Sequence, residues 1–135
     1  MAWNVVPNRE EIGFLMEASL IYRDSGRFAQ AREVLAGLRA MLPRNDAVLV
    51  TLGTVCFQQR DFEGAARYYK QALELNPRSA YACAHLGELE IFRMNRQEGT
   101  AYLQTAIKLD TRGPYGSFAR ALLEFSTEVQ YKETV

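Results

Sequence analysis

Hydrophobic residues recur along this chain at intervals of three and four, separated by polar residues. In the middle of the chain two such stripes follow each other: Leu49, Leu52, Gly53 and Cys56, and then Phe62, Ala65, Tyr69, Ala72, Leu73 and Leu75. This spacing places the residues of each stripe on one face of an α-helix. The sequence therefore predicts pairs of amphipathic helices that pack through these faces.

The pattern repeats after 34 residues. The matching pairs are Pro43 and Pro77, Phe28 and Phe62, Ala31 and Ala65, Gly53 and Gly87, Ala72 and Ala106, and Leu75 and Leu109. A helical hairpin of this length is too small to bury its apolar face alone, so neighbouring hairpins must share one continuous core. We predict an all-α solenoid in a single domain, with three repeats at residues 12–45, 46–79 and 80–113.

The ends of the predicted helices are marked by local signals. Asn8, followed three residues later by Glu11, resembles a capping box, and Asp46 and Ser79 are predicted N-caps. Residues 1–11 are predicted to form an N-terminal arm. Residues 114–130 are predicted to form a seventh helix, either a cap on the third repeat or a movable helix that competes with a partner.

The segment DFEGAARYYKQALELNP resembles a tetratricopeptide repeat. With the flanking segments IYRDSGRFAQAREVLAGLRAMLPRN and LGELEIFRMNRQEGTAYLQTAIKL, the chain is similar to the small cytoplasmic chaperones of bacterial type III secretion systems. The resemblance implies a right-handed superhelical solenoid and a chaperone in the bacterial cytoplasm. Its partner would be an apolar or amphipathic segment of a secreted or secretion-apparatus protein, held before export.

The resemblance also implies where a partner binds. In tetratricopeptide arrays the first helix of each repeat lines the concave face at positions two, five, nine and twelve. Here these positions hold Gly13, Met16, Leu20 and Arg23, then Ala47, Val50, Thr54 and Phe57, and then Tyr81, Ala84, Glu88 and Ile91. The set is largely apolar, which suits an apolar protein segment. The alternative is that the N-terminal arm around Trp3, Val5 and Val6, or a second copy of the chain, covers this face.

Other functions find less support in the sequence. The chain has 16 basic and 16 acidic residues, so its net charge of zero argues against nucleic acid as a partner. No stretch reaches the roughly 18 apolar residues of a membrane span. His85 has no recognisable catalytic partners, and Cys56 and Cys83 lack the spacing of metal or redox sites. We therefore expect a non-enzymatic protein without metal or cofactor.

Two alternatives to a secretion chaperone stay open. The chain could be a general tetratricopeptide scaffold or adaptor with no link to secretion. It could also form a homodimer through its terminal helices. A grip on a partner's C-terminal carboxylate, which some tetratricopeptide proteins use, is not expected, because no cluster of fixed positive charge is found among Met16, Leu20, Thr51, Tyr81 and His85.

Overall fold

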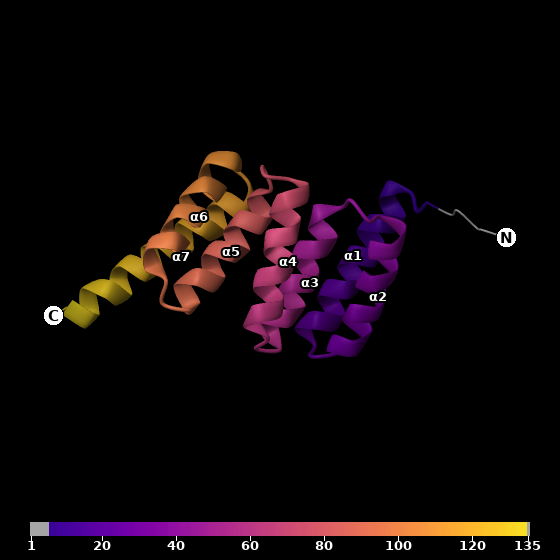
Figure 1. Ribbon diagram of the computed structural model, residues 1–135, viewed down its shortest axis with the longest axis horizontal. Coiled ribbons are helices and arrows are strands. Elements are labelled where there is room, and N and C mark those ends of the chain that lie inside the picture. Colours follow the sequence, from indigo (N-terminus) through magenta and orange to yellow (C-terminus); the bar gives the residue numbers. More distant parts are fainter. Residues whose placement is uncertain (1–5, 135) are drawn as a thin grey trace.

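The structure is a computed structural model that describes residues 6–134, with the backbone alone at positions 130, 131, 133 and 134. Over this range it consists of helices joined by short turns (Figure 1). The helices are α1 (Arg9–Asp24), α2 (Phe28–Met41), α3 (Asp46–Gln58), α4 (Phe62–Leu75), α5 (Ala80–Phe92), α6 (Arg96–Leu109) and α7 (Pro114–Thr134). The predicted all-α solenoid of three helical hairpins followed by a seventh helix is confirmed.

The helix starts agree with the sequence signals at two of three positions. The Asn8 side chain accepts a hydrogen bond from the backbone N–H of Glu11 and donates one to the Glu11 carboxylate, both at 2.8 Å. Ser79 caps α5 in the same way. The assignment of Asp46 as an N-cap is wrong: Asn45 is the N-cap of α3, and Asp46 is the first helical residue. There its carboxylate still interacts favourably with the helix dipole.

Both terminal segments differ from the predicted boundaries. Because Asn8 caps α1, residues 9–11 belong to this helix and not to an N-terminal arm. At the other end, α7 continues beyond residue 130 to Thr134, and no Gly or Pro stands there to stop it. Of the residues that the alternative places over the concave face, Trp3 and Val5 lie outside the described residues, and Val6 is 71% exposed.

The turn inside each hairpin has the same backbone shape. Gly26, Arg60 and Met94 follow one another at intervals of 34 residues and have φ angles of 77°, 62° and 68°. This left-handed conformation suits glycine and costs other residues about 1 kcal/mol or more. Only the first repeat has glycine at this position, so the second and third turns carry conformational strain.

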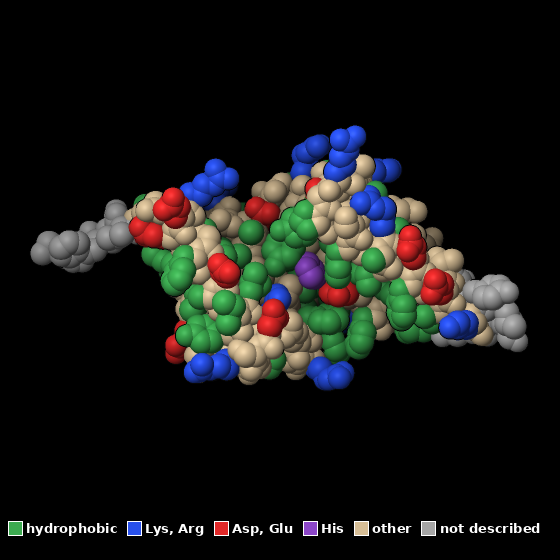
Figure 2. Space-filling view, turned by 180° about the vertical axis from the view of Figure 1, so that it is seen from behind, with side chains coloured by type: hydrophobic (Ala, Val, Ile, Leu, Met, Phe, Trp, Pro, Cys, Tyr) green, Lys and Arg blue, Asp and Glu red, His purple; other side chains and the backbone are tan. Residues whose placement is uncertain are grey.

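The hairpins stack in chain order, with the first helices side by side on one face. On that face α1 contacts α3, α3 contacts α5, and α5 contacts α7. The second helices, α2, α4 and α6, form the other layer (Figure 1). The face that carries the first helices is hollowed in the middle, and hydrophobic side chains gather in the hollow (Figure 2).

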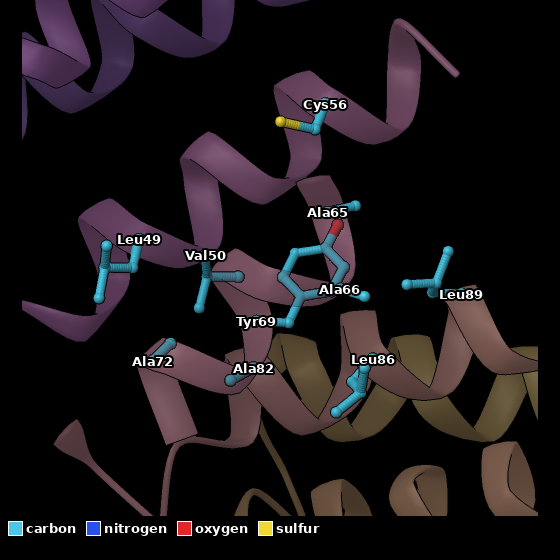
Figure 3. Packing of buried hydrophobic residues seen from close by; sticks show 10 residues of the cluster. All are labelled: Leu49, Val50, Cys56, Ala65, Ala66, Tyr69, Ala72, Ala82, Leu86 and Leu89. Carbon is cyan, nitrogen blue, oxygen red and sulfur yellow. The ribbon is translucent and has the colours of Figure 1, made fainter. Parts of the chain in front are cut away.

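The core is organised around close approaches between the two helices of a hairpin. The Tyr69 ring lies fully buried at the centre of the largest cluster of apolar residues (Figure 3). It packs directly on Gly53, where any Cβ atom would overlap the ring. Gly87 and Leu103 form the same contact in the third hairpin, where an added Cβ would lie 2.6 Å from Leu103 Cδ2. Glycine at these positions lets the helices approach closely.

Consecutive hairpins are joined by a second set of apolar contacts. Val48, Leu52 and Val55 of α3 are buried in one cluster with Ala31, Leu35 and Leu38 of α2. The corresponding residues of α5 are Ala82, Leu86 and Leu89, which are buried with Ala65, Tyr69 and Ala72 of α4. Helices α3 and α5 thus each bury one stripe against the second helix of the preceding hairpin.

Candidate functional site: a pocket between α3, α5 and α7

Helix α7 occupies one side of the hollow and is held there by aromatic contacts. The rings of Tyr81 and Tyr115 stack with their centroids 4.8 Å apart, and the rings of His85 and Phe118 lie 5.2 Å apart. The single histidine, purple in Figure 2, lies within the hollow among hydrophobic side chains. These contacts fix α7 beside α5 along the first turns of both helices.

Further along the same helices α7 leaves a pocket of about 440 Å³. Its wall is contributed by the C-terminal parts of α3 and α5, the turn after α5, the first residue of α6, and α7 from Leu122 onward. The lining residues are Phe57, Glu88, Ile91, Phe92, Met94, Arg96, Leu122, Phe125, Ser126 and Val129. Most of these side chains are apolar, so the pocket suits an apolar or amphipathic ligand.

The pocket has a rigid aromatic wall. Phe57 and Phe92 meet edge to face with their centroids 5.6 Å apart, and Phe62 contacts both rings at 5.5 and 5.1 Å. Aromatic pairs in these arrangements are worth about 0.5–1.5 kcal/mol each beyond their buried area. Phe92 and Phe125 nevertheless expose 53% and 61% of their surface, so both rings are accessible to a partner.

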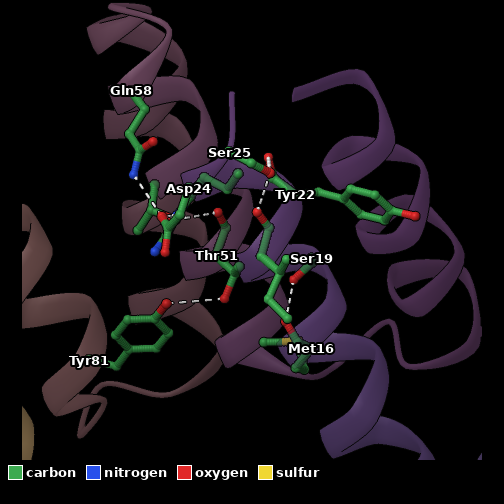
Figure 4. Close-up of polar contacts among 11 residues, drawn as sticks. Met16, Ser19, Tyr22, Asp24, Ser25, Thr51, Gln58 and Tyr81 are labelled. Carbon is green, nitrogen blue, oxygen red and sulfur yellow. Dashed lines mark hydrogen bonds and ion pairs between the residues drawn. The ribbon is translucent and has the colours of Figure 1, made fainter. Parts of the chain in front are cut away.

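Polar groups surround the apolar surface without filling it. Glu88, on the pocket wall, lies 3.2 Å from Nδ1 of His85. Across the hollow, the Thr51 and Tyr81 hydroxyls lie 3.1 Å apart (Figure 4), and burial raises the pKa of Tyr81. The contact between Thr51 and Tyr81 joins α3 to α5 beneath the hollow, whereas the pair of His85 and Glu88 lies within α5.

A second polar group joins α1 to α3. Arg23 donates from Nη1 to the Thr54 hydroxyl and from Nε to the Asp24 carboxylate, both at 2.8 Å. The hydrogen bond from Arg23 lowers the pKa of Asp24, which also accepts a hydrogen bond from Gln58 (Figure 4). The Arg23 guanidinium is therefore already engaged within the protein.

The structure separates the ten predicted binding residues into three groups. Phe57, Glu88 and Ile91 come together in the pocket. Four others are half-buried on the same face but outside the pocket: Met16, Leu20, Arg23 and Tyr81. Val50 and Ala84 expose no surface and Thr54 exposes 5%. The expectation that these last three are open to a partner is wrong.

The burial of Val50 and Ala84 has a geometric cause. Position five of α3 and of α5 faces the next first helix instead of the solvent. Val50 lies in one cluster with Ala82 and Leu86 of α5, and Ala84 lies in one cluster with Ala119 of α7. The pocket-lining side chains of α3 and α5 lie nearer the C-terminal ends of these helices, where the helices leave the pocket between them.

Sequence reasoning missed more than half of the pocket. It omitted Phe92 at the end of α5, Met94 in the turn that follows, Arg96 at the start of α6, and the residues from α7. A signal for α7 was present. If the period is continued from Pro114, positions two, five, nine and twelve fall on Tyr115, Phe118, Leu122 and Phe125. The last two line the pocket, so α7 lies like the first helix of a fourth repeat.

No helix among the described residues is both long and apolar enough to cross a membrane. Within the same residues no group of three or more His, Cys, Asp and Glu side chains comes together as a metal site. Cys56 and Cys83 are buried, and burial raises the pKa of both thiols.

Comparison with known proteins supports the fold. Residues 16–80 match a family model described as tetratricopeptide repeat. No curated protein matches the sequence significantly. Many solved structures do match, and the chain therefore has the fold of a tetratricopeptide-repeat solenoid.

Three of these structures illustrate the range of similar proteins. The first tetratricopeptide domain of Spaghetti (RPAP3), bound to the HSP90 peptide SRMEEVD, is 15% identical with a TM-score of 0.72, over 94% of this chain and 98% of that one. The Yersinia enterocolitica type III secretion chaperone SycD, in complex with a peptide of the translocator YopD, is 14% identical with a TM-score of 0.72. The match covers 95% of this chain and 98% of that one. The Sgt2 tetratricopeptide domain from Aspergillus fumigatus is 15% identical with a TM-score of 0.75. The match covers 96% of this chain and 85% of that one.

Proposed function

We propose that this protein binds an apolar or amphipathic segment of another protein in the pocket between α3, α5 and α7. The observation that carries the proposal is the pocket itself, in which two phenylalanine rings, Phe92 and Phe125, are more than half exposed beside an aromatic wall. Exposed apolar surface of this kind marks sites of interaction with a partner. Two solved structures with the same fold hold peptides of other proteins, which is consistent with this role.

The finer proposal is that the protein is a secretion chaperone in the bacterial cytoplasm. It would hold its client segment before export and prevent that segment from assembling or entering a membrane too early. The similarity to SycD supports this reading. A client that buries several hundred Å² of apolar surface would gain several kcal/mol at about 25 cal/mol per Å², before ordering costs are subtracted. Such a complex is stable but can be released.

In this proposal the client contacts Phe57, Ile91, Phe92 and Phe125 through apolar burial. Glu88 at the pocket wall would favour a client with a donor or a positive charge next to its apolar residues. Met16, Leu20 and Tyr81 would meet a longer segment that continues along the hollow.

Two substitutions test the proposal. Phe92→Glu and Phe125→Glu place charges in the pocket, yet both positions are exposed enough for the fold to tolerate them. Leu75→Glu is the matched control, because Leu75 is 40% exposed at the end of α4 and does not line the pocket. Each variant is expressed with an affinity tag in the source organism, and co-purifying proteins are identified by mass spectrometry.

We expect a secreted or secretion-apparatus protein to accompany the wild type and the Leu75→Glu variant but not the two pocket variants. A partner retained by all four proteins would contradict the pocket assignment. Pocket-dependent partners with no connection to secretion would favour the alternative, a tetratricopeptide scaffold or adaptor. Genes for secretion proteins next to this gene would favour the chaperone. Homodimer formation stays a prediction, which a solution mass near twice 15.3 kDa would support.

A further inference from the structure

The outer face of α1 carries large apolar side chains that nothing among the described residues covers. Phe14 is 71% exposed and Ile21 is 61% exposed. The residues one period later, Val48 and Val55 of α3, expose no surface at all. Ala18 lies between Phe14 and Ile21, and its counterpart in α3, Leu52, exposes 4%. The same holds for the counterparts in α5, which are buried.

This comparison shows what kind of surface α1 presents. In α3 and α5 the equivalent stripe is the one that packs against the second helix of the preceding hairpin. In α1 the stripe has the same spacing and the same apolar character but no helix in front of it. Two shallow depressions lie along it, one beside Phe14 and Leu15 and the other between Phe14 and Ile21. The face is therefore shaped to receive one helix.

The internal contacts also describe the helix that fits. The stripes that pack against α3 and α5 are Ala31, Leu35 and Leu38, and Ala65, Tyr69 and Ala72. In both helices a small residue is followed by a large one four positions later and by another apolar residue three positions after that. A helix with this pattern could approach α1 closely at its small residue and fill the depressions with its large one.

Charge distinguishes between possible occupants of this face. Glu10 and Glu11 line one depression and Glu17 lines the other, and all three are exposed. At the far end Arg27 lies over the Tyr22 ring, so the three carboxylates lie in the first three turns of α1, where Arg9 is the one basic residue. A second copy packed across a twofold axis at the middle of α1 would bring the two Glu17 carboxylates together. A helix with basic residues beside its apolar stripe would meet opposite charge.

Inside the array a basic residue also lies beside the apolar stripe. Arg32 of α2, next to the small residue Ala31, donates from Nε to the side-chain amide of Gln59, the C-cap of α3, at 3.0 Å. We propose that the outer face of α1, centred on Phe14, Ala18 and Ile21, binds an amphipathic helix of a partner protein. That helix has a small–large–apolar stripe at positions i, i+4 and i+7 and is flanked by lysine or arginine.

The chain supplies a probe for this proposal, because α2 carries the required stripe. The basic probe is a helix-stapled peptide of residues 28–41 with Glu33→Lys. The acidic probe has the same apolar residues with Arg32→Glu and Arg39→Glu. Binding of each labelled peptide to the full chain is measured by fluorescence anisotropy. We expect the basic probe to bind about fivefold more tightly than the acidic one at low salt, and this difference to vanish at 1 M salt, where charges are screened beyond about 3 Å.

Variants locate the site. The double variant Phe14→Ser and Ile21→Ser should weaken binding of the basic probe by about tenfold or more, since two apolar contacts are lost. Phe92→Ser is the matched control, an exposed phenylalanine in the pocket between α3, α5 and α7, and should bind the probe as the wild type does. Loss of binding in Phe92→Ser, or full binding in the double variant, overturns the proposal. It is also overturned if the wild type sediments as a dimer and the double variant as a monomer. None of these results depends on the client of the pocket.

Discussion

Tyr81 and Tyr115 stack ring on ring, with their centroids 4.8 Å apart and their planes inclined by 22°. They are also separated by 34 residues, which is one period of the repeat. The contact therefore joins equivalent positions of α5 and α7. It shows that α7 continues the array in the position of a first helix, and that its start is anchored in the hollow.

The Tyr115→Ala substitution should loosen this anchor. Removing the ring eliminates the stack and part of the buried area, so the free energy of unfolding should fall by about 1–3 kcal/mol. Amide hydrogen exchange should accelerate in the first turns of α7, whereas α1 to α4 should be unaffected. Tyr115→Phe keeps the stacking surface and serves as the control. Unchanged exchange in α7 would show that the stack does not hold this helix.

Gly53 and Gly37 should respond in opposite directions to the same substitution. In Gly53→Ala the new methyl group overlaps the Tyr69 ring, so unfolding should become easier by about 1–3 kcal/mol. In Gly37→Ala no atom lies within 4 Å of the new Cβ atom, and the free energy of unfolding should rise by up to about 1 kcal/mol through better helix propensity. Urea denaturation of both variants measures this difference. Equal effects at the two sites would contradict the close approach of α3 and α4.

The hydroxyl group of Tyr69 should contribute nothing to stability at neutral pH. Its oxygen is buried and has no hydrogen-bond partner among the described residues, and burial raises the pKa of Tyr69 well above its usual range. Tyr69→Phe should therefore be neutral or stabilise the fold by about 1 kcal/mol, since an unpaired buried polar group is removed. Tyr69→Ala should cost about 3–5 kcal/mol. Thermal denaturation of the two variants tests this, and a large loss in Tyr69→Phe would reveal a missing partner.

The turn of the second repeat offers a stabilising substitution. Arg60 adopts a φ of 62°, which glycine tolerates better than other residues. Arg60→Gly should raise the free energy of unfolding by about 1 kcal/mol, as measured by urea denaturation. Arg60→Ala, which keeps the strained Cβ atom, should give no such gain. A gain of equal size in both variants would mean that the arginine side chain, and not the backbone, carries the strain.

The two cysteines should resist modification in the folded protein. Burial raises the pKa of the Cys56 and Cys83 thiols above the ordinary value of 9.0, so little thiolate forms at pH 8. Both should react with a thiol reagent only when urea unfolds the chain. The raised pKa also means that the neutral thiols support the fold fully below about pH 9, and that this contribution is lost as the pH rises further. Rapid labelling of the native protein at pH 8 would contradict this.

The fold could be predicted from the sequence because identical residues recur at single positions of the repeat. Gly53 and Gly87 lie where a first helix meets a large side chain of the second helix, Tyr69 or Leu103, so their spacing reports the close approach of the two helices. The N-cap of α3 could not be predicted to the residue, because Asn45 and Asp46 are adjacent and both are good capping residues.

The site was harder to predict because it depends on contacts between hairpins. The spacing of Val50 and Thr54 places them on the concave side of α3. Whether they are exposed depends on the distance between α3 and α5, which the sequence pattern of one helix does not determine. Arg23, which bonds to Thr54, closes the same space from α1. Phe125 follows the period of the array, but only the path of α7 beside α5 brings it to the pocket.

The two ends of the solenoid are chemically different. The side of α7 that would face a second helix of its own holds Ser117, Ala121 and Glu124, whereas the outer side of α1 holds Phe14, Ala18 and Ile21. To lengthen this protein, additional hairpins should therefore be added before Asn8, where the apolar face of α1 can pack against them. Hairpins added after α7 would not pack against the solenoid and would behave as independent domains.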